Sequence, residues 1–387
     1  MSEDQAKGTR ALKVAVALDS FKGSLSSLQA GEAVARGVRV AYPDAEVAVR
    51  PLADGGEGTA AALVDGLHGS WRHVTVTGPL GVPVTAAYGL LPDGGAVLEM
   101  ASAAGITLVP AAARNPLLAT TFGVGELIAA AIQDGCRRFL VGIGGSATND
   151  GGAGLLQALG FRLLDAQGAE LPRGGAALAR LARIDRSQVL PQLADCSFRV
   201  ACDVTNPLCG PNGASAVFGP QKGASPDDVA RLDAALAHFA AVSGVPSDFP
   251  GAGAAGGLGY GFKAFLGAEL ARGVDIVLQE THFEDVVRTA DVIVTGEGRL
   301  VAQSAMGKAP QGVARLAKRY GKPALAFAGC VTPDAARLHD EGIDAFFPIL
   351  RTVTTLDEAL NVDTAAANLT AAAAEAFHLV RTFRGGR

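Results

Sequence analysis

The chain has 387 residues, of which 49% are hydrophobic and 18% charged, and its formal net charge is −5. This composition supports a sizeable core, argues against disorder, and makes nucleic acid an unsuitable partner. The five cysteines show no CxxC spacing, and neither an apolar start nor a run of about 18 uncharged apolar residues occurs, so we expect a cytoplasmic protein with no disulfide framework, zinc site or membrane span.

The first fifty residues predict a β-α-β unit. The Val-rich run Lys13–Leu18 is typical of a buried strand. Ser26 and Gln29 have capping-box spacing, which indicates a helix from there to about Tyr42, before Pro43. The alternating segment 46–50 is the next strand, and both strands are expected to end at the same edge of a parallel sheet.

The middle of the chain has a different pattern. Two alternating runs within Trp71–Met100, separated by turn residues, predict antiparallel strands. Residues 121–134 and 226–242 are expected to be helical, the second with an Asp-rich first turn. The apolar runs 138–143 and 198–204 are expected to be strands.

The last hundred residues return to alternating strands and helices. Strands are expected at 290–295, 323–327 and 345–350, and helices from Pro310 to about Gly321, at 332–340 and at 364–383. This alternation favours a doubly wound α/β sheet. We therefore expect a Rossmann-like domain formed by residues 1–75 and 286–387, a mixed α/β domain inserted at 76–285, and an active site in the cleft between the two.

Short, polar, glycine-rich segments recur along the chain, and most of them follow a predicted strand. They occupy residues 19–24, 53–59, 142–152, 202–207, 219–224, 251–259 and 295–299, with Gly307-Lys308 further on. Ligands of open α/β sheets bind beyond the carboxyl ends of the strands, so we expect these segments to share one cleft.

The segment GIGGSATNDGG at 142–152 shows the pattern best. Its glycines let the backbone approach a ligand, and Ser146, Thr148, Asn149 and Asp150 are all suitable N-cap residues for a helix reaching Leu159. A helix start of this kind binds anions, although an ordinary capped turn has the same sequence. The chain has no Walker A motif, and GAGAAGG at 251–257 matches GxGxxG only loosely, without a preceding strand.

The charged residues in these segments point to phosphoryl transfer. That reaction needs cations for the phosphates, carboxylates for Mg²⁺ and one acid that accepts a hydroxyl proton. A lone lysine is usually a solvated surface residue and a lone strand-end Asp is usually a turn residue, so the prediction depends on their joint recurrence. The residues concerned are Lys22, Lys222, Lys308, Arg299, Asp19, Asp54, Asp203 and Glu297.

Taken together, these segments resemble the glycerate kinase type-1 family, also described as glycerate 2-kinase. The resemblance rests on DSFKGSLSS, RPLADGGEGT, GIGGSATNDGGAGLLQALG, CDVTNPL, FGPQKGA, PGAGAAGGLG and TGEGR, in this order, and runs from about Lys13 to near the C-terminus. It implies ATP-dependent phosphorylation of D-glycerate to 2-phosphoglycerate, a bilobal α/β fold and a place in glyoxylate or sugar-acid metabolism. We expect ATP, D-glycerate and Mg²⁺ as small-molecule partners, and a monomer or homodimer.

Roles for individual residues follow from the chemistry. We expect Lys22 and Lys222 to neutralise phosphate charge, and Arg299 to bind a carboxylate or phosphate in bidentate fashion. Asp203 or Asp19 would accept the proton of the C2 hydroxyl. Asp54 and Glu57 are the expected Mg²⁺ ligands. Further predicted ligand-binding residues are Ser24, Gly55, Gly56, Gly144, Gly145, Ser146, Thr148, Asn149, Asp150, Asn206, Gly256, Gly257, Gly296, Glu297, Gly298 and Lys308.

Two residues depart from the family's usual pattern. Val301 stands where family members usually have Asp, and Met306 where they often have His. These departures leave a related hydroxy-acid kinase of altered activity and a catalytically inactive sensor as alternatives. Among kinases, phosphorylation at C3 is the nearest alternative, and the Rossmann-like pattern of the two chain ends also leaves a nucleotide-binding oxidoreductase open.

Overall fold

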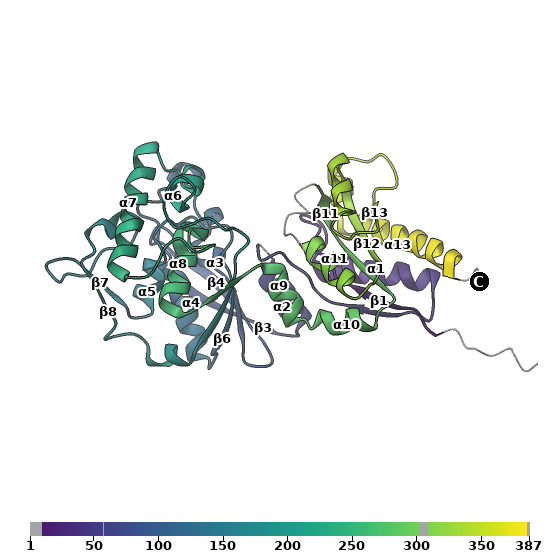
Figure 1. Cartoon of the computed structure of the whole chain (residues 1–387), viewed down its shortest axis with the longest axis horizontal. Helices are drawn as coiled ribbons and strands as arrows, with labels where there is room; N and C mark the ends of the chain where they lie inside the picture. Colours follow the sequence, from purple (N-terminus) through teal and green to yellow (C-terminus); the bar gives the residue numbers. More distant parts are fainter. Residues whose placement is uncertain (1–9, 57, 302–308, 385–387) are drawn as a thin grey trace, which may run out of the picture. The chain divides into compact units, whose positions relative to one another are not determined.

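The computed structural model describes residues 10–56, 58–301 and 309–384, which form parts of two compact units. One unit contains residues 1–54 and 277–387, and the other contains residues 55–276. The predicted α/β fold class is confirmed (Figure 1). The units divide before Gly55 and before Val277, whereas the sequence predicted divisions after residues 75 and 285. The strand that begins at Ser70 pairs within the inserted unit, which places residues 70–75 there.

The unit formed by the two chain ends contains a fully parallel sheet of five strands, in the order β13-β12-β11-β1-β2. The strands are β1 (Lys13–Val16), β2 (Glu46–Val49), β11 (Val292–Leu300), β12 (Ala324–Val331) and β13 (Ala345–Pro348). The chain passes from β1 to β2 in one direction and from β11 to β13 in the other. The topological switch point therefore lies between β1 and β11, where doubly wound sheets bind ligands.

Helices pack against both faces of this sheet. They are α1 (Ser27–Ala41), α10 (Phe283–Thr289), α11 (Ala309–Arg319) and α13 (Val362–Arg384). Helices α1 and α13 share one core with Val14, Val16 and Val294, whereas α10 contacts β1 and α11 contacts β11 and β12. A parallel sheet with helices on both faces, and with a strand order that runs outward in two directions from its middle, is a doubly wound sheet. The predicted doubly wound arrangement is therefore confirmed. The capping box at Ser26 and Gln29 is also confirmed.

The N-terminal and C-terminal parts of this unit meet where α1 packs against α13 (Figure 1). Gly37 of α1 makes this close approach possible, because a Cβ at this position would lie 2.3 Å from the carbonyl oxygen of Thr370. Thr370 Oγ1 also donates a hydrogen bond to the carbonyl oxygen of Ala33, at 3.0 Å. These contacts close the core on the face of the sheet that α1 and α13 cover.

The inserted unit contains a mixed sheet of six strands, in the order β10-β9-β6-β5-β4-β3. The strands are β3 (Ser70–Thr77), β4 (Pro83–Leu90), β5 (Ala96–Glu99), β6 (Arg138–Gly142), β9 (Ser197–Ala201) and β10 (Glu269–Ala271), and β7 (Arg162–Leu164) and β8 (Arg183–Asp185) form a separate pair. Strands β3 and β4 pair antiparallel, as predicted, and β5, which was not predicted, pairs antiparallel with β4. Strands β5, β6, β9 and β10 pair parallel. Polar segments that follow the parallel strands therefore leave the sheet at one edge.

The other α-helices lie mostly in the inserted unit. The inserted unit has α2 (Thr59–Gly66), α3 (Ala101–Ala104), α4 (Phe122–Gln133), α5 (Ala153–Ala158), α6 (Ala214–Phe218), α7 (Pro226–Ser243) and α8 (Ala254–Leu266), while α9 (Gly273–Glu280) crosses the boundary and α12 (Leu356–Leu360) precedes α13. The helix predicted at 332–340 is a 3₁₀ helix at Pro333–Leu338. Among the described residues, no helix is long and apolar enough to cross a membrane.

Candidate active site

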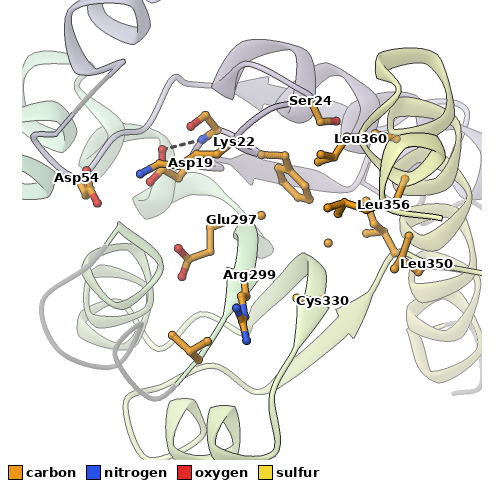
Figure 2. Close-up of a pocket in the computed structure, with 18 residues that line it drawn as sticks. Asp19, Lys22, Ser24, Asp54, Glu297, Arg299, Cys330, Leu350, Leu356 and Leu360 are labelled. Atoms are coloured by element: carbon orange, nitrogen blue, oxygen red, sulfur yellow. Dashed lines mark hydrogen bonds between the residues drawn. The ribbon is translucent and has the colours of Figure 1, made fainter. Parts of the chain in front are cut away.

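A pocket of about 510 Å³ opens at the switch point of the parallel sheet (Figure 2). Asp19 and Lys22 reach it from the segment after β1, and Asp54 from the segment after β2. Glu297 and Arg299 reach it from the carboxyl-terminal part of β11. Ser24 and Gly298 also line it, so seven of the predicted site residues share one pocket within one unit. Its size is within the usual range for small-molecule sites.

Backbone contacts fix the segments that carry these side chains. The amide of Asp19 donates to the carbonyl oxygen of Gly296, at 2.9 Å, which joins the ends of β1 and β11. The buried Ser27 Oγ donates to the carbonyl oxygen of Leu18, at 2.6 Å, and accepts from the amide of Leu52, at 2.8 Å. The segments that follow β1 and β2 are thereby linked, and Asp19 has a defined position.

Asp19 has a perturbed ionisation. Burial raises the pKa of its carboxyl to about 7, and the neighbouring charge of Asp54 adds to the increase. The amide of Ser20, which donates to Asp19 Oδ1 at 2.6 Å, acts in the opposite direction. A carboxyl that changes protonation near neutral pH is suited to general base catalysis.

The sequence predicted a strand that ends at Thr295, with the glycine-rich segment TGEGR at its end, and this end of the strand is wrong. The segment belongs to β11, which continues to Leu300 because β12 pairs with it as far as Val331. Gly296 is tightly packed in this ladder, since a Cβ there would lie 2.0 Å from the carbonyl oxygen of Phe327. Glu297 is buried while Arg299 is exposed, so the strand itself presents both charges to the pocket.

The donor set fits Mg²⁺ only in part. Asp19, Asp54 and Glu297 line the same pocket, but no group of three or more His, Cys, Asp or Glu within the described ranges could hold a metal ion. Mg²⁺ commonly binds one or two carboxylates and takes its other ligands from water and substrate phosphates. The pocket fits such a nucleotide-bound ion. The predicted ligand Glu57 and the predicted phosphate ligand Lys308 lie outside the described residues.

The inserted unit contains a second group of predicted site residues, centred on Lys222. Its side chain is only 2% exposed, and Nζ donates to Ser146 Oγ and to the carbonyl oxygen of Thr148, both at 2.7 Å. Burial lowers the pKa of Lys222 to about 7, and the charge of Asp150 acts in the opposite direction and raises it. In this conformation, Lys222 holds the segment after β6 in place.

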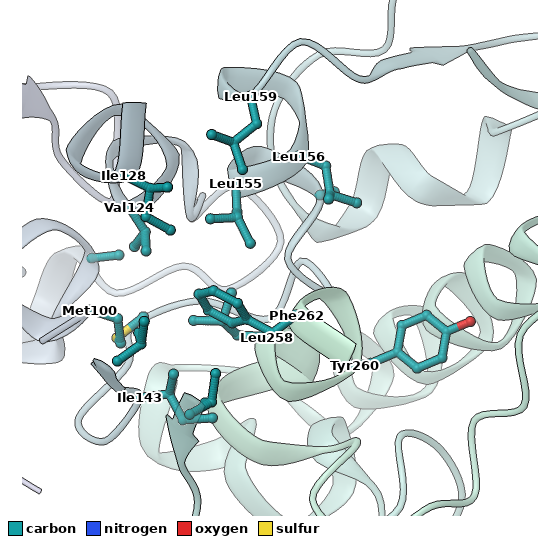
Figure 3. Close-up of a cluster of buried hydrophobic side chains, with 14 of the residues drawn as sticks. Met100, Val124, Ile128, Ile143, Leu155, Leu156, Leu159, Leu258, Tyr260 and Phe262 are labelled. Carbon is teal, nitrogen blue, oxygen red and sulfur yellow. The ribbon is translucent and has the colours of Figure 1, made fainter. Parts of the chain in front are cut away.

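Asp150 is fully buried and anchors two helices. Oδ2 accepts from the amide of Thr121 at 2.8 Å, from Thr121 Oγ1 at 2.9 Å and from the amide of Gly154 at 3.2 Å, and Oδ1 accepts from the amide of Gly152 at 3.2 Å. Burial raises the pKa of this carboxyl, and the hydrogen bonds from Thr121 oppose the increase. Leucines 155, 156 and 159 then pack in the same core as Val124 and Ile128 of α4 (Figure 3).

The predicted helix after GIGGSATNDGG is much shorter than expected. It begins at Ala153, and its N-cap is Gly152, which is in the left-handed region that glycine adopts easily. None of Ser146, Thr148, Asn149 and Asp150 is therefore the N-cap residue. Asp150 still caps the first turn, because its Oδ2 accepts from the amide of Gly154, and Thr121 Oγ1 accepts from the amide of Leu155.

Gly256 and Gly257 lie inside α8, where the sequence predicted only a loop. With Ala255 they form three successive left-handed residues, at φ 53°, 70° and 88°. A Cβ on Gly256 would lie 2.0 Å from the carbonyl oxygen of Thr148, and the amide of Gly151 donates to the carbonyl oxygen of Gly256 at 2.9 Å. The start of α8 thus packs directly on the segment after β6.

Other predicted residues gather at the carboxyl ends of β6 and β9. A Cβ on Gly55 would lie 3.1 Å from Asp203 Oδ2, and a Cβ on Gly144 would lie 3.5 Å from Cα of Gly56. Asp203 is exposed, and its Oδ1 accepts from the amide of Gly273 at 3.1 Å. Two further residues belong to neighbouring loops: Gly145, left-handed at φ 72°, and Asn206, whose Nδ2 donates to the carbonyl oxygen of Asn212.

Lys222→Met should lower the free energy of unfolding by about 2 kcal/mol, because two buried oxygens lose their donor. The loss should increase between pH 7 and pH 9. The folded pKa of Lys222 lies below the unfolded value, so the unfolded chain holds more protons in this range, and the lysine's contribution to stability rises with pH. Urea unfolding at both pH values measures the effect. Lys263→Met, at an exposed lysine of the same unit, should show no such slope, and equal slopes in both variants would contradict the prediction.

Comparison with known proteins identifies the family. A family model described as the glycerate kinase family matches residues 14–381. The chain belongs to the glycerate kinase family. It is 50% identical to a glycerate kinase of Bacillus subtilis and 49% identical to a glycerate 2-kinase of Escherichia coli, covering 90% of this chain and 93% of each relative. A crystal structure assigned to glycerate kinase 2 of Salmonella typhimurium LT2 superposes with a TM-score of 0.90 at 47% identity, over 97% of this chain and 100% of that one.

The resemblance drawn from the motifs is thus confirmed, and the chain is an enzyme of the kinase class. Val301, which departs from the pattern we expected of the glycerate kinase family, lines the switch-point pocket, and Met306 lies outside the described residues. Sequence reasoning missed the apolar side of this pocket, which includes Phe21, Ile349, Leu350 and Leu356. Such residues have the same pattern as ordinary core and helix positions, so the sequence contains no signal for them.

Proposed function

We propose that this enzyme transfers the γ-phosphoryl group of ATP to the C2 hydroxyl of D-glycerate and releases 2-phosphoglycerate and ADP. Membership of the glycerate kinase family supports the substrate class. The observation that supports the site is the pocket at the switch point, where Asp19, Lys22 and Arg299 converge. The relative from Escherichia coli, named a glycerate 2-kinase, supports the C2 position.

The charges of the pocket fit a metal–nucleotide complex. Asp19, Asp54 and Glu297 contribute three carboxyl groups, whereas Lys22 and Arg299 contribute two cations. A triphosphate without a metal would be repelled by the carboxylates, so Asp54 and Glu297 would hold a Mg²⁺ ion that neutralises phosphate charge when bound. Lys22 and Arg299 then donate to phosphate oxygens and stabilise the charge that develops on them.

Asp19 is the better candidate for the general base. The oxygen of the C2 hydroxyl forms a bond to the γ-phosphorus, the bond from that phosphorus to the bridging oxygen breaks, ADP leaves, and the hydroxyl proton moves to the Asp19 carboxylate. The raised pKa of Asp19 and its partly buried position favour this role. Asp203, the other candidate, is exposed and accepts a backbone hydrogen bond from Gly273.

A coupled assay tests the reaction and its position. The enzyme is mixed with ATP, Mg²⁺ and D-glycerate, and product is consumed by enolase in the absence of a mutase, which removes 2-phosphoglycerate only. We expect continuous product consumption and NMR signals of a C2 phosphate ester. A product that accumulates unless mutase is added would indicate phosphorylation at C3, and absence of ATP-dependent turnover would reject the proposed function.

The inserted unit also carries residues predicted to bind ligand, and we propose that one of them, Asn149, takes part in this reaction. Asn149→Ala should then lower kcat or raise the KM for D-glycerate in the same assay. Asp165→Asn, a change in a solvent-accessible turn of the same unit, is the matched control. Wild-type kinetics for Asn149→Ala would restrict the catalytic residues to those of the switch-point pocket.

A further inference from the structure

The switch-point pocket has two chemically different sides. Figure 2 shows the carboxyl groups of Asp54 and Glu297 on one side and Leu350, Leu356 and Leu360 on the other. The apolar side is completed by Phe21, Ile349, Ala359 and Ala365. The chemistry proposed above uses only the charged side, so the apolar side requires its own explanation.

The chain builds this apolar side with a short helix. Thr355 and Glu358 form a capping box that starts α12. Leu356 and Leu360 are four residues apart and so lie on the same face of the helix. Leu360 also approaches the β1 segment, because its methyl carbons would lie 3.7 Å from a Cβ on Gly23. Leu360 therefore reaches the segment that carries Lys22.

Two leucines of the pocket are open to solvent. Leu356 is 72% exposed and Leu350 is 40% exposed, although both line the pocket. Exposed apolar side chains that line a cavity beside charged groups are typical of sites for ligands with one apolar and one charged part. Of the two substrates, D-glycerate is polar throughout, whereas a nucleotide carries a flat apolar base attached to its phosphates.

We propose that this pocket binds the nucleotide, with its base against Leu350, Leu356 and Leu360 and its phosphates toward Lys22, Glu297 and Arg299. The proposal rests on the proposed function, because it takes ATP as the phosphoryl donor. It places the base of the nucleotide on residues that no chemical motif of the sequence marks.

The test compares two ligands that share phosphates and differ in the base. Calorimetry with Mg²⁺ measures binding of adenylyl imidodiphosphate and of tripolyphosphate to the full-length enzyme. Leu356→Gln should raise the Kd of adenylyl imidodiphosphate by about tenfold, the factor expected when one leucine no longer covers an apolar ligand. The Kd of tripolyphosphate should not change. Val353→Gln is the matched control, since Val353 is fully exposed in the same segment and does not line the pocket.

The outcomes separate this proposal from the proposed function. If the enzyme makes 2-phosphoglycerate from ATP while Leu356→Gln binds adenylyl imidodiphosphate as the wild type does, the position of the base is wrong and the function stands. An equal loss for both ligands, or an equal loss in Val353→Gln, also overturns the position of the base. A wild-type protein that neither binds the analogue nor turns over ATP overturns both. Thermal unfolding checks that the variants fold, which the exposure of both positions favours.

Discussion

Replacing Asp19 with asparagine is expected to lower kcat for D-glycerate phosphorylation by about 10² to 10⁴, the usual contribution of a general base. The wild-type kcat/KM should rise with pH through about 7, because only the deprotonated carboxylate accepts a proton. Asp19→Asn should lose this rise, since an amide does not titrate. Initial rates across pH 5.5 to 9 measure both effects.

The same substitution has an opposite consequence for stability. The folded pKa of Asp19 is raised, so its contribution to stability is fully present below the unfolded value of 3.8 and is lost as pH rises through about 7. At pH 8 the ionised carboxylate is partly buried near Asp54, and Asp19→Asn removes this unfavourable charge. We therefore expect the inactive variant to unfold at an equal or higher urea concentration than the wild type at pH 8, as is common for active-site residues.

Asp203→Asn is the variant that decides whether Asp19 or Asp203 is the general base. It should retain the pH-dependent rise of kcat/KM, because Asp203 is exposed and is not the proposed base. A loss of that rise in Asp203→Asn, with an unchanged profile in Asp19→Asn, would show that Asp203 is the base.

The sequence predicted the fold well where local signals agree with long-range pairing. The run around Val14, the capping box at Ser26 and the alternating strands near Val76 each formed the expected element. The failures share a physical cause. Glycines made 295–299 and 251–259 resemble loops, but strand pairing with β12 and packing of Gly256 on Thr148 decide their structure. A local pattern contains no information on such partners.

The site was predictable only in its charged part. Asp19, Lys22 and Glu297 can be recognised in the sequence, because charged residues beside glycines at a strand end are rarely part of a hydrophobic core. Their convergence follows from parallel strands that end at one edge. Lys222 and Asp150 show the same signal, yet the structure buries both and bonds them to the protein itself. Sequence alone therefore does not distinguish a ligand-binding charge from one that holds a loop.

Asp150→Asn is expected to lower the free energy of unfolding by about 4 kcal/mol, because four donors around a buried carboxylate would face an amide that accepts fewer hydrogen bonds. Urea unfolding at pH 7 measures this loss. Asp165→Asn is the control, since Asp165 also accepts backbone hydrogen bonds but lies in a solvent-accessible turn, and its loss should stay below about 1 kcal/mol. Wild-type stability of Asp150→Asn with a raised KM would instead indicate direct ligand binding.

The double variant with Lys222→Met tests whether the two buried charges act together. The charge of Asp150 favours the protonated form of Lys222, so Asp150→Asn leaves a buried ammonium that is less well compensated. Replacing this lysine should then destabilise the protein less than it does in the wild type, and the double variant should lose at least about 1 kcal/mol less than the sum of the single losses. Additive losses would mean that the two residues stabilise the segment after β6 independently, through their separate hydrogen bonds to Thr121 and Ser146.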